Sequence, residues 1–276
     1  MSQMTDEEKS RGVVACSAGN HAQGVGYAAR ALGIPATIFL PSTAPISKVE
    51  ATRQYGVDIK LVDGVYDDAY EEARKWQKAN NAVFVHPFND EDVIAGQGTI
   101  GLEILRQLPD MDAVVVPVGG GGLISGIAYV IKKLKPSCKV YGVQAEGACS
   151  MSHAMEKNKH CGLSKVSTFA DGIAVKCPGE LTFDLCMQYV DQVITVSDDE
   201  IATAILTLME QQKLVQKENR ALKTIVNRAS PGREIVGQSP TISSLLCMVD
   251  KIAPTRVSVL IQGECGTGKE LIAHRI

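Results

Sequence analysis

Two glycine-rich segments could bind anions through their backbone N–H groups. The first, residues 17–24 (Ser-Ala-Gly-Asn-His-Ala-Gln-Gly), follows the apolar run 13–16 and opens a stretch with helical periodicity. The second follows Val118 and consists of Gly119, Gly120, Gly121 and Gly122. Glycines that lead into a helix bring several N–H donors against a phosphate or a carboxylate, and the helix N-terminus adds partial positive charge. Both segments are therefore candidate anion sites.

Each segment also has a plainer interpretation. Four glycines can form no more than a flexible strand-to-helix turn, and Asn20 and His21 can simply cap a helix. Taken together in this order, the two segments favour the chemical interpretation. An asparagine at the mouth of such a turn can lay its amide beside a planar ring, while neighbouring N–H groups hold a carboxylate.

Four strings resemble the pyridoxal-phosphate-dependent threonine/serine dehydratases (threonine ammonia-lyases) of the tryptophan-synthase-β-like fold, above all the catabolic threonine dehydratases. They are residues 17–24, 93–99 (Val-Ile-Ala-Gly-Gln-Gly-Thr), 119–122 and 170–175 (Ala-Asp-Gly-Ile-Ala-Val). The resemblance covers about residues 5–215. It implies a lyase that removes the β-hydroxyl of threonine or serine as water and yields a 2-oxo acid and ammonia. The sequence leaves open which of the two amino acids is preferred.

The same resemblance implies roles for individual residues. Asn20 would meet the 3-hydroxyl of pyridoxal 5'-phosphate, and Gly172 would lie near that cofactor. The cofactor phosphate would be held by Gly119, Gly120, Gly121 and Gly122. The substrate carboxylate would be bound by the backbone of Ser17, Ala18, Gly19, Asn20 and His21. Ala18 stands where similar serine racemases carry a second serine, so the resemblance favours dehydration over racemisation.

The lysine that forms the family's Schiff base lies upstream of the asparagine loop, in a Ser-Phe-Lys-like context that this sequence does not contain. The nearest upstream lysine, Lys9, stands in an acidic lead-in that is expected to be helical. A lysine of this kind forms the Schiff base and moves the Cα proton. We therefore assign no catalytic residue and expect a dehydratase segment that is truncated at both ends and poorly active or inactive.

A third glycine-rich segment near the end of the sequence has the phosphate-loop spacing G-x-x-x-x-G-K. It lies between an expected strand at 258–262 and an expected helix at 270–275. Together with residues 235–240 it resembles the start of the AAA+ domain of sigma-54-type enhancer-binding activators, over about residues 216–276. The residues that could bind ATP are Gly263, Gly266, Gly268, Lys269 and Glu270. Glu270 replaces the usual Ser/Thr, and no Walker-B strand follows, so ATP hydrolysis is not expected.

Alternating apolar runs and helical stretches would position these loops. Strands are expected at 13–16, 36–41, 57–63, 82–87, 113–118, 139–144 and 191–196, and helices at 20–32, 66–80, 123–134, 198–214 and 241–252. This alternation predicts an α/β fold with doubly wound, mostly parallel sheets, which the resemblance identifies as fold-type II, followed by a fragment of a P-loop α/β domain. The expected parts are a small domain (1–88), a partial large domain (89–215), a linker (216–234) and the P-loop fragment (235–276).

Composition sets limits on partners. A net charge of -3 over 276 residues argues against a nucleic-acid surface, and no apolar run is long enough to span a membrane. The eight cysteines form no Cys-x-x-Cys pair, so we expect reduced thiols and a cytoplasmic protein. His153, His160 and Cys161 are spaced too irregularly for a metal site. A homo-oligomer is compatible with the sequence.

Three functional hypotheses follow. The first is the dehydratase segment, joined near residue 215 to the start of an activator domain, with a gene-fusion or assembly artefact as an explanation of the join. The second is a non-catalytic protein that binds an amino acid or the cofactor. The third is a nucleotide-binding module of a transcriptional activator. Cofactor titration separates the first two from the third, and keto-acid production separates the first from the second.

Overall fold

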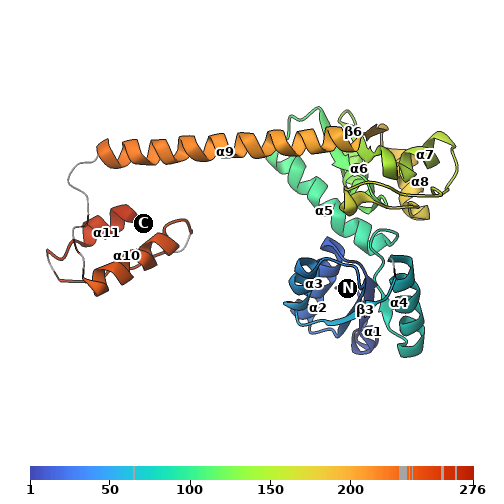
Figure 1. The fold of residues 1–276 in the computed structure, drawn as a ribbon, viewed down its shortest axis with the longest axis horizontal. Coiled ribbons are helices and arrows are strands. Elements are labelled where there is room, and N and C mark those ends of the chain that lie inside the picture. Colours follow the sequence, from blue (N-terminus) through green and yellow to red (C-terminus); the bar gives the residue numbers. More distant parts are fainter. Residues whose placement is uncertain (65, 230–234, 236, 238, 256–257, 265) are drawn as a thin grey trace. The chain divides into compact units, whose positions relative to one another are not determined.

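The computed structural model describes residues 1–64, 66–229, 235, 237, 239–255, 258–264 and 266–276 (Figure 1). They form two compact units, Met1–Thr203 and Ala204–Ile276. The first unit contains both predicted anion-binding loops, and the second contains the phosphate-loop string.

The first sheet is parallel, with the strand order β3-β2-β1-β4. Its strands are β1 (Val13–Cys16), β2 (Ala36–Pro41), β3 (Asp58–Val62) and β4 (Val83–Phe84). Helices α2 (Asn20–Leu32), α3 (Ile46–Arg53) and α4 (Tyr66–Asn80) connect them. All four side chains of β1 are apolar and buried, as expected for a strand whose two faces are both covered. The asparagine loop therefore leaves the carboxyl end of an interior strand.

The second sheet has the order β5-β6-β7 and is also parallel. Its strands are β5 (Ala113–Pro117), β6 (Lys139–Ala145) and β7 (Gln192–Val196). Its helices are α5 (Glu91–Gln107), α6 (Gly122–Leu134), α7 (Ser150–Glu156) and α8 (Glu180–Tyr189). Short helical turns, η1 (Glu146–Ala148) and η2 (Asp171–Ile173), lie between them. Among the described strands, β5 and β7 form the two outer edges, and Val115 on β5 is 64% exposed.

Helix α6 contributes to the hydrophobic core that packs on the second sheet. Ile124, Ile127 and Ile131 recur at helical spacing and are buried in one core cluster. On another side, α6 lies so close to α5 that a Cβ atom built on Gly126 would be 2.6 Å from the backbone nitrogen of Gly98. Small residues at this crossing allow the two backbones to approach, and α6 consequently holds the tetraglycine loop at its own N-terminus in a fixed place.

The predicted elements of this unit are largely confirmed. Helices α2 and α4 have the expected bounds, and each predicted strand has a counterpart. Strand β4 is shorter than expected, at two residues instead of 82–87. Pro87 has no N–H to donate to a ladder, and the imidazole of His86 turns the chain by accepting N–H groups of the residues that follow. The lead-in with Lys9 is helix α1 (Asp6–Arg11), capped by Thr5.

Helix α9 (Asp198–Ala229) is longer than the expected helix 198–214 and continues through residue 216. The second unit also contains α10 (Pro240–Ile252), capped by Ser239, and α11 (Lys269–Arg275). Arg275 joins the two short helices through a bidentate ion pair with Asp250, at 3.0 and 3.1 Å. None of the helices in the described part of the chain is long and apolar enough to cross a membrane.

The strand expected at 258–262 is wrong, because these residues have no regular secondary structure. A strand requires a neighbour that completes its hydrogen-bond ladder. No described residue pairs with 258–262 in this way. The apolar run Val259-Leu260-Ile261 thus has strand-forming residues without a sheet to join.

Candidate functional site

The two glycine-rich loops of the first unit line one cavity of about 1560 Å³. Strand order reverses between β1 and β4, and the asparagine loop lies there at the carboxyl end of β1. Ligands of α/β proteins bind in the crevice at such a switch point. All the predicted cofactor and substrate residues of this unit line the cavity: Ser17, Ala18, Gly19, Asn20, His21, Gly119, Gly120, Gly121, Gly122 and Gly172. The volume exceeds the roughly 300–1,000 Å³ of usual small-molecule sites, so it is large enough for more than one small ligand.

The tetraglycine loop is held from behind. Gly121 has φ 101°, a left-handed conformation that favours glycine. A Cβ atom on Gly121 would lie 2.7 Å from the Cβ of Thr182, which is fully buried. The Thr182 hydroxyl donates to the carbonyl oxygen of Gly120 at 2.6 Å. The N–H groups of residues 119–122 donate to none of the described residues, which leaves them available to an anion.

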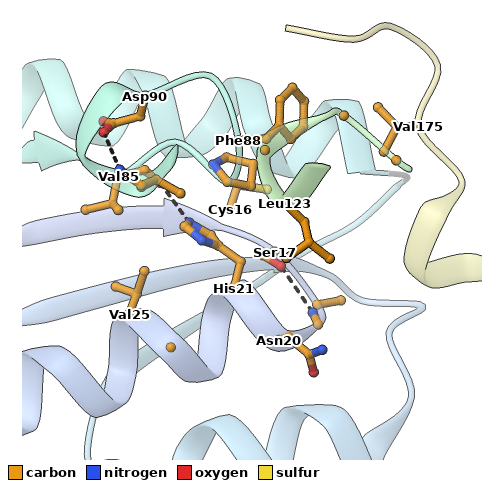
Figure 2. Close-up of a pocket in the computed structure, with 18 of the residues that line it drawn as sticks. Cys16, Ser17, Asn20, His21, Val25, Val85, Phe88, Asp90, Leu123 and Val175 are labelled. Atoms are coloured by element: carbon orange, nitrogen blue, oxygen red, sulfur yellow. Dashed lines mark hydrogen bonds between the residues drawn. The ribbon is translucent and has the colours of Figure 1, made fainter. Parts of the chain in front are cut away.

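The asparagine loop offers a second set of donors. Ser17 N–H donates to the carbonyl of Phe39, and the Ser17 hydroxyl accepts the N–H of Gly19 at 3.1 Å. The N–H groups of Ala18, Asn20 and His21 have no acceptor within the described residues. Figure 2 shows Ser17, Asn20 and His21 together where β1 passes into α2. These three N–H groups could donate to a carboxylate, and the roles assigned to the loop residues stay predictions.

Two half-buried histidines support these loops without supplying charge. His21 Nε2 donates to the carbonyl of Val85 at 3.0 Å, and burial lowers the pKa of His21. His86 Nδ1 accepts the N–H groups of Phe88 and Asn89, at 3.2 and 2.8 Å. Burial lowers the pKa of His86 to about 4. Both imidazoles are therefore neutral at pH 7 and supply no positive charge to the cavity.

An ion pair at the cavity wall connects residues that are distant in sequence. The ammonium group of Lys48, on α3, contacts the carboxylate of Asp171, the neighbour of Gly172. The hydrogen bond from Lys48 holds the pKa of Asp171 below its usual value. Sequence reasoning missed this pair, because nothing in either segment signals a partner 123 residues away.

Two lysines line the cavity, Lys48 and Lys176. Lys9, the upstream lysine considered in the sequence, is not among the lining residues and forms an ion pair with Asp6 at 3.5 Å. Phe88 also lines the cavity, and Figure 2 shows its ring beside the loop that leads to Leu123. The sequence offered no chemical reason to select a phenylalanine.

The phosphate-loop residues of the second unit form one turn ahead of α11. Gly266 and Gly268 have φ of 83° and 79°, and Glu270 lies in the first turn of the helix. The ammonium group of Lys269 donates to the carbonyls of Gly263, at 2.8 Å, and Glu264. The lysine thus closes its own loop. Cys265 lies outside the described residues.

Comparisons with known proteins agree with this architecture. Residues 1–219 match the family model of pyridoxal-phosphate dependent enzymes, and residues 235–276 match that of the Sigma-54 interaction domain. Over 212 residues the chain is 55% identical to an L-threonine ammonia-lyase of Thermotoga maritima, which covers 77% of this chain and 53% of that protein. It is 45% identical over 230 residues to an L-threonine ammonia-lyase of Geobacter sulfurreducens, covering 83% and 57% of the two chains. The chain thus spans about half the length of these relatives.

Solved structures show the same fold. The processed form of threonine deaminase isoform 2 from Solanum lycopersicum aligns with a TM-score of 0.73 and 42% identity, over 76% of this chain and 61% of that one. Maize serine racemase aligns with a TM-score of 0.71 and 39% identity, over 73% and 61% of the two chains. The expected arrangement of mostly parallel α/β sheets is confirmed.

Proposed function

The chain belongs to the family of pyridoxal-phosphate dependent enzymes, and from that premise we propose that its first unit is the ligand-binding part of a threonine/serine ammonia-lyase. The observation that carries the proposal is the pair of loops, residues 17–21 and 119–122, whose free N–H groups line one cavity. One loop suits the cofactor phosphate and the other suits the substrate carboxylate. The relatives from Thermotoga maritima and Geobacter sulfurreducens are named for threonine, which makes threonine the first substrate to test.

The residues present fit pyridoxal phosphate. The N–H groups of residues 119–122 would hold its phosphate, and the segment 171–175 would enclose that loop, because a Cβ atom on Gly119 would lie 3.1 Å from the Cγ2 of Val175. The exposed amide of Asn20 would hold the ring hydroxyl. When bound, the cofactor acts as the electron sink that makes the Cα–H of an amino acid acidic.

The protein's own contribution is orientation. The N–H groups of Ala18, Asn20 and His21 would hold the carboxylate of threonine or serine and so fix Cα relative to the ring. The neutral His21 anchors this loop to Val85 and leaves the carboxylate to the backbone donors. Ala18 has no side-chain proton to deliver, which favours loss of water, and finally a 2-oxo acid and ammonia, over racemisation.

Turnover is a separate question from binding. The 276 residues contain no Ser-Phe-Lys-like string, and we propose that they bind the cofactor but convert threonine poorly. The direct test is calorimetric titration of the chain with pyridoxal phosphate, followed by an assay for 2-oxobutanoate formed from threonine. Saturable binding that weakens in Asn20→Ala supports the proposal. No saturable binding contradicts it, and rapid keto-acid formation contradicts poor turnover.

A second candidate function is nucleotide binding at residues 263–270. It is favoured by the left-handed Gly266 and Gly268, which turn the loop directly into α11. ATP would have to displace the Lys269 ammonium group from the carbonyls that it now contacts. Titration with ATP should then give saturable binding that Lys269→Ala removes; identical titrations of the two proteins would exclude this candidate.

A further inference from the structure

Phe88 belongs to neither glycine-rich loop, yet it occupies the space beside the tetraglycine turn. A Cβ atom built on Gly122 would lie 2.9 Å from the Cβ and 3.0 Å from the Cα of Phe88. A Cβ atom on Gly120 would overlap the Phe88 ring itself. Real Cβ atoms essentially never approach below 3.0 Å. Phe88 therefore takes the volume that side chains would fill in a loop of ordinary residues.

Phe88 is itself held in place by His86. The Nδ1 atom of His86 accepts the N–H of Phe88 at 3.2 Å and that of Asn89 at 2.8 Å. The two rings meet edge to face, with centroids 4.7 Å apart. A single neutral imidazole thus fixes both the backbone and the ring of Phe88.

The far side of the tetraglycine turn is fixed by α8. The carbonyl oxygen of Gly120 accepts the N–H of Gly179 at 3.2 Å and the hydroxyl of Thr182 at 2.6 Å. Asn89 is bound to the same helix, because its Oδ1 accepts the N–H of Leu181 at 2.9 Å. Asn89, which follows Phe88, and Gly120, which lies beside the Phe88 ring, are therefore both hydrogen-bonded to the first turn of α8.

Residues 85–89, the segment that contains Phe88, also contact the asparagine loop (residues 17–24). The N–H of Val85 donates to Val14 on β1 at 2.9 Å, and the carbonyl of Val85 accepts the imidazole N–H of His21. Residues 85–89 consequently run from a contact with the asparagine loop to a contact with the tetraglycine loop, as Figure 2 shows for Val85 and Phe88.

We propose that Phe88 is a positioning residue for phosphate binding: it sets the directions of the N–H groups in residues 119–122, and His86 keeps it there. This inference rests on the proposed function, since it assumes that the loop receives a phosphate. The ring donates nothing to the anion. It acts by pressing on Gly120 and Gly122, so that their N–H groups converge instead of sampling the many conformations open to glycine.

The test compares ligands that differ only in the phosphate. The full 276-residue chain and its variants are titrated calorimetrically with pyridoxal phosphate and with pyridoxal. The wild type should bind pyridoxal phosphate more tightly, and Phe88→Leu should reduce this preference by about tenfold or more, the effect of losing one hydrogen bond to a charged group. Binding of pyridoxal should change less than about twofold if only phosphate contacts are affected.

Controls separate positioning from general destabilisation. Phe39→Leu makes the same change at a phenylalanine that is 4% exposed and lies outside the cavity lining, and should retain the preference for the phosphate. Phe88→Tyr, which keeps the ring, should also retain it. His86→Leu should lose the preference, and His86→Asn should restore part of it, because the Asn Oδ1 can accept the same N–H groups.

Gly120→Ala, which leaves Phe88 in place, remains informative if Phe88→Leu does not fold. Gly120→Ala should weaken phosphate binding through collision with the Phe88 ring, and adding Phe88→Ala should recover part of the loss, because these two residues are in contact. An unchanged preference in Phe88→Leu, or additive losses in the double variant, would overturn the inference. A wild type without any preference for pyridoxal phosphate over pyridoxal would instead refute the proposed function.

Discussion

Lys48 and Asp171 form an ion pair at the wall of the cavity, between helix α3 and the short turn that contains Gly172. The pair joins the first sheet's helices to a segment that lies against the tetraglycine loop. Both side chains retain solvent contact, at 36% and 72% exposure. The pair should therefore contribute little to the free energy of unfolding, and its main effect should be to hold the two segments together at the cavity wall.

The first prediction concerns this pair. Lys48→Met should change the free energy of unfolding by less than about 1 kcal/mol, because water screens exposed ion pairs. Asp171 has a lowered pKa, so the contribution is present above its ordinary value of 3.8 and is lost as pH falls through the folded-state pKa. Urea denaturation of both proteins at low and high salt measures the contribution of the ion pair. A loss of several kcal/mol in Lys48→Met would contradict a weak, solvent-screened pair.

The second prediction concerns pH. The folded-state pKa of His86 is about 4, below the ordinary 6.5, so the unfolded chain binds more protons between these values. Stability should be complete above pH 6.5 and should decline as pH falls from 6.5 towards 4. The pKa of His21 is lowered as well. For His86, the charge of Asp90 raises the pKa and that of Arg74 lowers it. The free energy of unfolding, measured from pH 7 to pH 4.5, should fall less steeply in His86→Asn, and equal slopes would exclude His86 as a source.

The third prediction concerns the core of α6. Ile131 is fully buried, and Ile131→Ala should reduce the free energy of unfolding by about 2–5 kcal/mol through lost burial and the cavity left behind. Leu134, on the same helix, is 63% exposed, and Leu134→Ala should cost about 0.5 kcal/mol or less. Chemical denaturation of the pair decides; similar losses would mean that α6 does not pack as described.

The fourth prediction compares two glycines of the α5–α6 pair. Gly126→Ala should destabilise the protein by about 1–3 kcal/mol or more, because the new methyl group would meet the backbone of α5. Gly96→Ala should stabilise it by about 0.5–1 kcal/mol, since Gly96 is exposed on α5 and a Cβ atom there meets nothing within 4 Å. Thermal melting of both variants gives the signs, and a stabilised Gly126→Ala would argue against the close crossing.

The fifth prediction tests the support behind the tetraglycine loop. Thr182→Val removes the hydroxyl that donates to Gly120 and should cost about 1–3 kcal/mol, the penalty for weakening a buried hydrogen bond. Thr182→Ser keeps the donor and should lose less. Denaturation midpoints of the two variants provide the comparison; equal losses would show that methyl packing, and not the hydrogen bond, is what matters.

Local patterns predicted much of the first unit. The period of the apolar residues in 20–32 and 66–80 gave the limits of α2 and α4, because each helix has one face against a sheet. The two loops could be located because glycine strings have few uses in that position. That both loops belong to one site was implied by the family resemblance, because the loops follow strands of two different sheets, β1 and β5.

What escaped prediction depends on contacts between distant residues. Phe88 looks like any core phenylalanine until the tetraglycine loop lies beside it, and Lys48 shows no sign of Asp171. The run 258–262 has strand-forming residues but no described partner, so composition alone misled. Sequence pattern reports what a segment can form, and only tertiary context decides whether it does.

The border strand β5 has a practical consequence. Its outward peptide groups have no ladder partner among the described strands, and Val115 on this strand is 64% exposed. Such a margin is a template on which a second molecule can dock edge to edge. Self-association of the purified protein should accordingly increase with its concentration. Light scattering should rise on concentrating the sample, and Val115→Lys should delay that rise by adding a charge to the edge strand.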